Sequence, residues 1–211
     1  MANIFQKIAF NQHNYQQPDD AGHAIERNRQ NYIGEFGVGH ESWNFNLDQV
    51  IDGSVHGYMK PDNKKLENEL HTIIFYYEDA DKNKYIVGYY KNCKYLGKNT
   101  AERKTATKKL SELTNQRINE VYQVCQESKF QQLKGYNKNK VSKEFKLKET
   151  SFKLKVQPKD VFLLENPIPF SAETFTSILG KQLYNKFGNY NLIPNEKMPL
   201  FLKKMGLKAF K

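Results

Sequence analysis

Cysteine, tryptophan and long apolar stretches are all scarce in this sequence. Its two cysteines, Cys93 and Cys125, form no CxxC pair, so neither a zinc ribbon nor a disulfide scaffold is indicated. The five histidines show no HxxxH or HExxH spacing, and we expect no metal and no cofactor. No segment approaches the roughly 18 apolar residues of a membrane span, and the N-terminal residues lack the apolar core of a signal peptide. The sequence therefore predicts a cytoplasmic protein with free thiols and no membrane partner.

Positive charge is concentrated in one third of the chain. The formal net charge is +10, and residues 91–155 hold 17 basic and 6 acidic residues against 16 and 17 in the remainder. Lysines that neutralise phosphates gain affinity by releasing counterions, so this excess predicts a surface that follows a nucleic-acid backbone. A solvated face without a partner is the alternative. The lysines expected to contact the backbone are Lys91, Lys94, Lys98, Lys104 and Lys108.

Short β-branched and aromatic runs separated by turn-forming residues are typical of strands. Runs of this kind predict strands in three segments, 53–61, 72–79 and 84–92, with a hairpin loop over 79–84. The mixed apolar pattern over 4–10 favours a first strand, with a short helix as its alternative. A short helix over 21–29, with an Asp cap, is expected between the first two strands.

The second half begins with a helical segment. Over residues 99–128, an apolar stripe recurs at helical spacing and predicts one helix or two, with a lysine-rich polar side. The sequence FKLK then occurs at 145–148 and again at 152–155, and its alternation predicts two strands or one bent strand. An apolar run over 160–170 is followed by a helix from Ser171 to near Gly188. The segment after 198 is expected to be a docking helix, and attachment to a membrane surface is its alternative.

These elements favour the α+β class. Because regular βαβ alternation is missing, we expect a small mixed, largely antiparallel β-barrel or sheet with helices packed against it. One domain is expected over residues 1–170, including a basic helical insertion at 99–135. Residues 171–211 are expected to form a C-terminal helical extension that packs on the same domain.

Several segments, in order along the chain, are similar to a known family: NYIGEFGVGHESWNF, GSVHGYMKP, IIFYYED with YIVGYYKN, and FKLKVQPKDVFLLENPIPF. They resemble the N-terminal modules of modification-dependent restriction endonucleases, which are similar to EVE and YTH domains of the PUA-like superfamily, over most of residues 31–170. The resemblance implies a small PUA-like barrel that flips a base out of its duplex and holds it in an aromatic pocket. The base would be methylated or hydroxymethylated cytosine, or methylated adenine, in DNA.

The sequence departs from this family in two places. Residues 188–197 are not glycine-rich, and no HNH nuclease follows. Any cleavage in a restriction context would therefore need a nuclease domain or subunit as a partner.

The resemblance implies a base pocket around the single tryptophan. Trp43 would be a wall, and polar neighbours would read the base edge. The predicted pocket residues are His40, Glu41, Ser42, Trp43, Asn44, Tyr89, Tyr90 and Asn92. Trp43 as a core anchor, and His40 with Glu41 as a cap or core hydrogen-bond pair, remain alternatives. Tyr89 and Tyr90 are adjacent on a strand and face opposite sides, so at most one reaches a pocket.

Two other functions are compatible with the sequence. A PUA-like RNA-binding module would share every feature except the substrate. A Mg²⁺-dependent nuclease of the PD-(D/E)xK type would use Asp62 in KPDNKK and the triplet Glu144-Phe145-Lys146, with acids on the metal and a lysine assisting the attacking water. Such triplets arise by chance in a lysine-rich chain, and we expect no catalysis.

Overall fold

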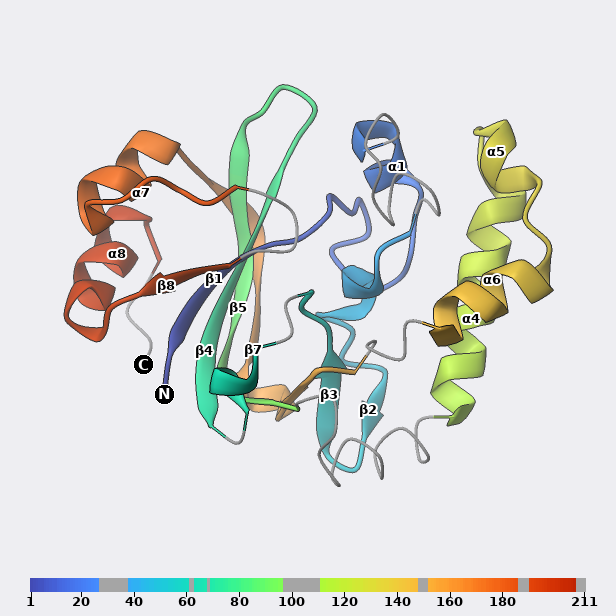
Figure 1. Cartoon of the computed structure of the whole chain (residues 1–211), viewed down its shortest axis with the longest axis horizontal. Helices are drawn as coiled ribbons and strands as arrows, with labels where there is room; N and C mark the ends of the chain where they lie inside the picture. Colours follow the sequence, from blue (N-terminus) through green and yellow to red (C-terminus); the bar gives the residue numbers. More distant parts are fainter. Residues whose placement is uncertain are drawn as a thin grey trace.

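The computed structural model describes residues 1–26, 38–60, 63–67, 69–96, 111–147, 152–185 and 190–207, which form a mixed α+β fold (Figure 1). Within these ranges the eight strands are β1 (Asn3–Lys7), β2 (Val50–Ile51), β3 (Ser54–Gly57), β4 (Leu70–Glu78), β5 (Lys84–Tyr95), β6 (Leu154–Val156), β7 (Val161–Phe170) and β8 (Tyr190–Ile193). The six α-helices described are α1 (Ala21–Glu26), α4 (Ser111–Glu127), α5 (Gln131–Lys134), α6 (Lys138–Leu147), α7 (Ala172–Leu179) and α8 (Met198–Lys204). Short 3₁₀ helices are η1 (His40–Trp43), η2 (Lys64–Leu66), η3 (Pro158–Asp160) and η4 (Asn195–Lys197).

The strands form one sheet in the order β2-β3-β6-β5-β4-β1-β8, with β7 also paired to β5. β1 and β4 are parallel, and the other pairs are antiparallel. One edge of β5 is shared, because its residues 84–90 pair with β7 and its residues 94–95 pair with β6. The sheet therefore forks at β5 and, in the part of the chain described, stays open. The α+β class with a mixed sheet is confirmed, whereas the predicted PUA-like barrel is not, because the sheet is open in the described residues.

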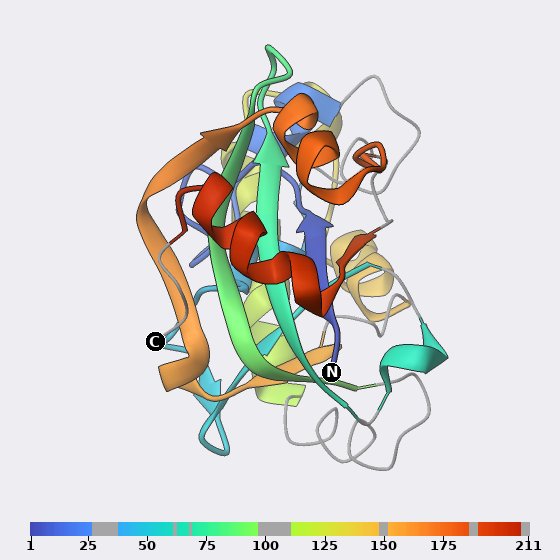
Figure 2. The same ribbon diagram turned by 90° about the vertical axis from the view of Figure 1, so that its left-hand side faces the viewer.

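Alternation along β1 sends neighbouring side chains to two different cores. Phe5 packs with Phe175 of α7 and Phe201 of α8, which cover one face of the sheet (Figure 2). Ile4 faces the opposite side and belongs to a core with Tyr90 of β5 and residues of β3 and β6. The sheet is thus buried on both faces, as the almost continuous apolar run of β4 predicts.

Helices α4, α5 and α6 form a further layer on the side of the sheet away from α7 and α8 (Figure 1). The core of this layer joins Ile118 and Cys125 of α4 to Phe145 of α6 and Trp43 of η1. The predicted helical stripe is confirmed from Leu113 to Cys125, where every fourth residue is buried. Trp43 lies where this layer meets the rest of the fold.

Most of the predicted strands are confirmed. β3, β4 and β5 form in the segments 53–61, 72–79 and 84–92. A backbone hydrogen bond from Asp79 N to Asn83 O, 2.9 Å long, closes the hairpin between β4 and β5. These runs combine β-branched and aromatic residues with a clear turn, so local pattern was sufficient to place them.

The C-terminal extension differs from the prediction in two ways. Ser171 caps α7 as expected, accepting a hydrogen bond from Thr174 N at 3.0 Å, but the helix ends at Leu179 and not near Gly188. Gly180 adopts a left-handed conformation with φ of 69°, which stops the helix. The extension is also not wholly helical, because β8 adds a strand beside β1.

Residues 145–147 of the first FKLK copy lie in α6, so the strand predicted there is wrong. Val141 and Phe145 are four residues apart, which places them on one helical face, and both are buried in the α4–α6 core. Four alternating residues are too few to separate a strand from a helix. The second copy does enter a strand, with Leu154 of β6 buried and Lys155 partly exposed.

The remaining expectations concern thiols and the C-terminal helix. Cys93 and Cys125 are both free and buried, as predicted. Burial raises the pKa of the Cys125 thiol to about 11, so this thiol stays protonated near neutral pH. α8 packs Phe201 and Leu202 against α7, which confirms the docking helix. No helix in the described ranges is long and apolar enough to cross a membrane.

Candidate functional site

Residues 40–44, predicted to line a base pocket, form a buried unit. All four side chains of η1 are buried. The Glu41 carboxylate accepts a hydrogen bond from Ala9 N at 3.0 Å, which ties η1 to the segment after β1. A Cβ atom at position 39 would lie 2.7 Å from the Glu41 carboxyl carbon, so Gly39 leaves room for this bond. Glu41 thus satisfies a buried backbone donor.

Trp43 is held on three sides. Its side chain is 1% exposed, and its indole Nε1 donates to Glu120 Oε2 of α4 at 2.6 Å. The Arg117 guanidinium lies 4.8 Å from the centre of the indole ring, and Phe145 of α6 meets the ring edge-on at 6.0 Å. Burial lowers the pKa of Arg117 to about 9, so this arginine remains charged at pH 7. A base could reach the indole only if α4 and α6 moved away, and this favours the core alternative for Trp43.

The other buried members of the predicted pocket also make internal contacts. The Asn44 side chain accepts from Tyr58 N at 2.8 Å and donates to Tyr58 O at 3.0 Å. Both polar atoms of its amide are therefore hydrogen-bonded to the backbone. The hydroxyl of Tyr90, which is fully buried, donates to Asn44 O. The His40 ring packs beside Tyr58 and Phe145, with ring centres 5.1 and 4.8 Å apart. Ser42 is 4% exposed within the same unit.

Tyr89 and Asn92 of β5 lie apart from this unit, and Tyr89 is partly buried against the core formed with α7 and α8. Tyr89 stacks on Phe162 of β7 with ring centres 4.7 Å apart and an interplanar angle of 17°. Lys91 Nζ lies 5.0 Å from the centre of the Phe162 ring. Asn92 is exposed, has a left-handed φ of 45°, and donates to Asp160 Oδ1 at 3.2 Å. Tyr89 and Tyr90 therefore face opposite sides of the strand, as predicted.

Lysines continue this surface beyond the aromatic pair. Lys94 of β5 lies directly opposite Lys155 of β6, and both are partly exposed. Lys159 of η3, next to Asp160, is exposed. We call this surface the β5 strip: Tyr89, Lys91, Asn92, Lys94, Lys155, Lys159 and Phe162. Lys98, Lys104 and Lys108, also predicted to contact a backbone, lie outside the described residues.

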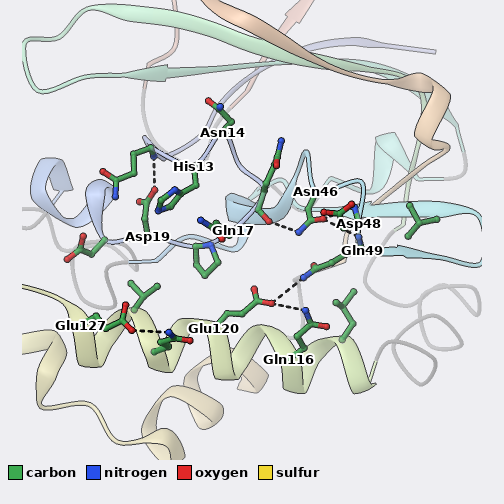
Figure 3. A pocket seen from close by; sticks show the side chains of 18 of the residues that line it. His13, Asn14, Gln17, Asp19, Asn46, Asp48, Gln49, Gln116, Glu120 and Glu127 are labelled. Carbon is green, nitrogen blue, oxygen red and sulfur yellow. Dashed lines mark hydrogen bonds between the residues drawn. The ribbon is translucent and has the colours of Figure 1, made fainter.

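A groove of about 1210 Å³ runs between α4 and the segments 12–20 and 46–51 (Figure 3). Its lining contains six carboxylates: Asp19, Asp20, Asp48, Glu112, Glu120 and Glu127. Eight asparagine and glutamine side chains also line it, and none of the lining residues that the structure describes is lysine or arginine. The polar side of the helix, predicted to be basic, is thus acidic over the 111–127 part that is described.

The groove is connected to Trp43 through Glu120. Glu120 Oε1 accepts from Gln116 Nε2 at 2.9 Å and from Gln49 Nε2 at 3.4 Å (Figure 3). Glu120 Oε2 accepts from the indole N–H of Trp43. Gln49 Oε1 in turn accepts from Arg117 Nε at 2.9 Å. The groove residues Glu120, Gln116 and Gln49 therefore belong to the same hydrogen-bond network as the only tryptophan.

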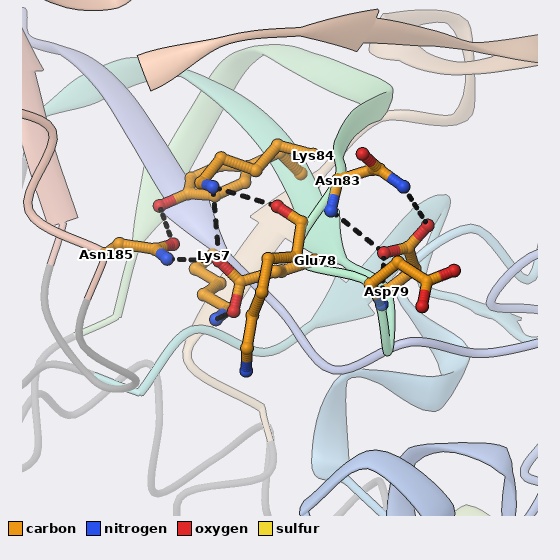
Figure 4. Close-up of polar contacts among 9 residues, drawn as sticks. Lys7, Glu78, Asp79, Asn83, Lys84 and Asn185 are labelled. Carbon is orange, nitrogen blue, oxygen red and sulfur yellow. Dashed lines mark hydrogen bonds and ion pairs between the residues drawn. The ribbon is translucent and has the colours of Figure 1, made fainter.

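A second charged cluster lies at the end of the sheet where β4 meets β5 (Figure 4). Glu78 Oε1 contacts Lys7 Nζ at 3.1 Å, and Glu78 Oε2 contacts Lys84 Nζ at 3.3 Å. Asn185 also donates to Glu78, and Tyr76 donates to Asn185 at 3.3 Å. The Lys7 and Glu78 side chains are 3% and 6% exposed. The cluster joins β1, β4 and β5, and its burial suits a structural role.

The nuclease pattern predicted from the sequence falls largely outside the described residues. Asp62 and the side chains of Glu144 and Lys146 lie outside the described residues, and the backbone of the triplet is helical. In the described ranges, no three His, Cys, Asp or Glu side chains gather as potential metal ligands.

Comparison of the chain with protein-family models, curated proteins and solved structures finds no match. Function is therefore inferred from the residues of this chain alone. Sequence reasoning missed Phe162 and the whole groove. The apolar run over 160–170 is a signal for Phe162, but the groove joins three segments that show no common pattern.

Proposed function

We propose that this chain is a nucleic-acid-binding module and that the β5 strip is its contact surface. The observation that carries the proposal is the partly exposed stack of Tyr89 on Phe162 with Lys91 beside it. An unpaired base gains about 1–3 kcal/mol by stacking on an aromatic side chain. Lysines at the edge of such a platform can hold the phosphates on either side.

The lysines of the strip are spaced to follow a backbone. Lys91 and Lys94 are three residues apart on β5, a separation of about 10 Å at the usual strand rise. Lys155 extends the line across the sheet to β6. A phosphate chain laid along the strip would contact Lys91, Lys94, Lys155 and the exposed Lys159. The neighbouring carboxylate, Asp160, accepts a hydrogen bond from Asn92.

The expected target is a modified base flipped out of DNA in a restriction context. This specificity rests on the sequence resemblance, because six of the eight residues it implies for the pocket, all except Tyr89 and Asn92, are buried in η1 and its neighbours. DNA is preferred over RNA on the same ground, and a nuclease partner would supply any cleavage. We place the protein in the cytoplasm, as its free cysteines suggest.

Duplex binding should weaken steeply with salt, and the double variant Lys91→Ala/Lys94→Ala should reduce the log-log slope by about two, one for each lost phosphate contact. Fluorescence anisotropy over a salt series measures both. Lys134→Ala/Lys138→Ala, which removes two exposed lysines from α5 and α6, is the matched control and should leave the slope unchanged. Equal slopes for the two double variants would remove the β5 strip from the interface.

The same assay separates the possible targets. Oligonucleotides with methylcytosine, hydroxymethylcytosine, methyladenine or no modification are compared as DNA duplexes, together with RNA counterparts. Tyr89→Ala should cost about 1–3 kcal/mol of binding free energy if a base stacks there. Preference for RNA would favour the RNA-binding alternative, and cleavage on adding Mg²⁺ would favour a nuclease.

A further inference from the structure

One row of side chains crosses the sheet from the β5 strip into the protein interior. Lys94 of β5 lies opposite Lys155 of β6, and Lys155 lies opposite His56 of β3. Residues directly opposite one another in antiparallel strands project from the same face, with Cβ atoms about 5 Å apart. The three side chains therefore form a line on one face, in which the two lysines are partly exposed and His56 is 3% exposed.

His56 is the buried member of the row, and its surroundings disfavour the protonated ring. The ring meets Phe152 edge-on, with ring centres 6.3 Å apart, and the Arg117 guanidinium lies 5.0 Å from the centre of the Phe152 ring. Among the described residues, His56 Nδ1 is buried and has no hydrogen-bond partner. Burial, followed by the charges of Lys155 and Arg117, lowers the pKa of His56 to about 4. The ring is therefore neutral near pH 7 in the free protein.

The charged groups around the ring, among the described residues, come from three segments. Lys155 of β6 and Arg117 of α4 oppose its protonation, whereas Asp52, in the turn between β2 and β3, favours it. Lys153, just before β6, is also buried and donates to Lys60 O at 2.8 Å. Arg117 is 1% exposed, so a nucleic acid at the surface reaches only Lys155 among the cations that act on the ring.

We infer, on the basis of the proposed function, that nucleic-acid binding at the β5 strip is coupled to protonation of His56. A backbone phosphate held by Lys94 and Lys155 offsets the lysine charge that opposes a proton on the ring. Because the ring is buried, this change in charge is weakly screened by water. Binding therefore takes up a proton at His56, and by linkage a lower pH strengthens binding.

The test follows the ring C–H signals of the histidines by NMR as pH is lowered, with and without a DNA duplex. The variant His56→Gln identifies the His56 signal by its loss. In the complex, the pKa of His56 should rise from about 4 to about 5. Between about pH 7 and about pH 4.5, the parent should then gain about threefold more duplex affinity than His56→Gln gains. His13, which is exposed and outside the row, should titrate alike in both samples.

The variant Lys155→Met tests the row in the free protein, because it removes a charge that opposes protonation. It should raise the pKa of His56 without duplex and reduce the further rise on binding. Lys159→Met, which removes an exposed lysine of the β5 strip outside the row, is the matched control and should leave the pKa of His56 unaltered in the free protein.

The outcomes separate the coupling from the interface. An unchanged pKa of His56 in a sample where the duplex is bound would overturn the coupling and leave the interface standing. Equal pKa values of His56 in Lys155→Met and Lys159→Met would also overturn the coupling. Absence of duplex binding at any pH would overturn both proposals.

Discussion

Trp43→Ala should cost about 3–5 kcal/mol of folding stability, the range for large aromatic residues truncated in a core. The indole is 1% exposed, and its removal leaves a cavity between η1, α4 and α6. It also leaves Glu120 Oε2 without its indole donor and Arg117 without one of its two aromatic partners, the other being Phe152. Urea denaturation followed by circular dichroism measures the loss.

Trp43→Phe is the matched control, because it keeps an aromatic ring and removes only the indole N–H and part of the volume. It should lose clearly less stability than the alanine variant. If Trp43→Ala instead folds with nearly full stability and loses nucleic-acid binding, Trp43 is the wall of a base pocket and the core assignment is wrong.

Glu78→Gln should also destabilise the fold by about 3–5 kcal/mol, the usual cost of removing one partner of a buried ion pair. Lys7 is 3% exposed and would keep its charge without the carboxylate (Figure 4). The double variant Lys7→Met/Glu78→Leu replaces both charges by apolar side chains and should recover most of the loss. A Glu78→Gln protein within about 1 kcal/mol of the parent would show that the pair contributes little.

The pH dependence follows from the same cluster. Burial raises the pKa of Glu78, but the hydrogen bond from Asn185 and the charges of Lys7 and Lys84 outweigh it and lower the pKa below 4.5. A carboxyl group with a lowered pKa in the folded state stabilises the fold above its unfolded pKa and loses that contribution as pH falls through the folded value. The stability gap between the parent and Glu78→Gln should therefore be full at pH 7 and narrow below about pH 4.5.

The sequence pattern predicted the strands and helices whose own residues carry the signal for them. β4 and β5 carry β-branched and aromatic residues on either side of an Asp-rich turn, and α4 carries a buried stripe from Leu113 to Cys125. The fork at β5 was not predictable in this way, because pairing with both β6 and β7 depends on residues 59 or more positions away.

The site was harder to predict for a related reason. Whether Trp43 is a wall or an anchor depends on what covers it, and Glu120 is 77 positions away in sequence. The groove is lined by amide and acidic side chains of α4 and of two early loops. None of these three segments alone carries a sequence pattern that predicts a groove. The sequence names Tyr89 only through the family resemblance, as a pocket residue, and Lys91 only through the excess of lysine, as a backbone contact; the structure places both beside Phe162.

The most direct test of nucleic-acid binding on the β5 strip is a lysine-acetylation footprint, read by mass spectrometry with and without a duplex at low salt. Lys91, Lys94, Lys155 and Lys159 should each be acetylated several-fold more slowly in the complex, because phosphates cover their amines. Lys134 and Lys138, exposed on α5 and α6, should react at the same rate in both samples. Unchanged rates at the four strip lysines, in a sample where the duplex is shown to be bound, would contradict the proposed interface.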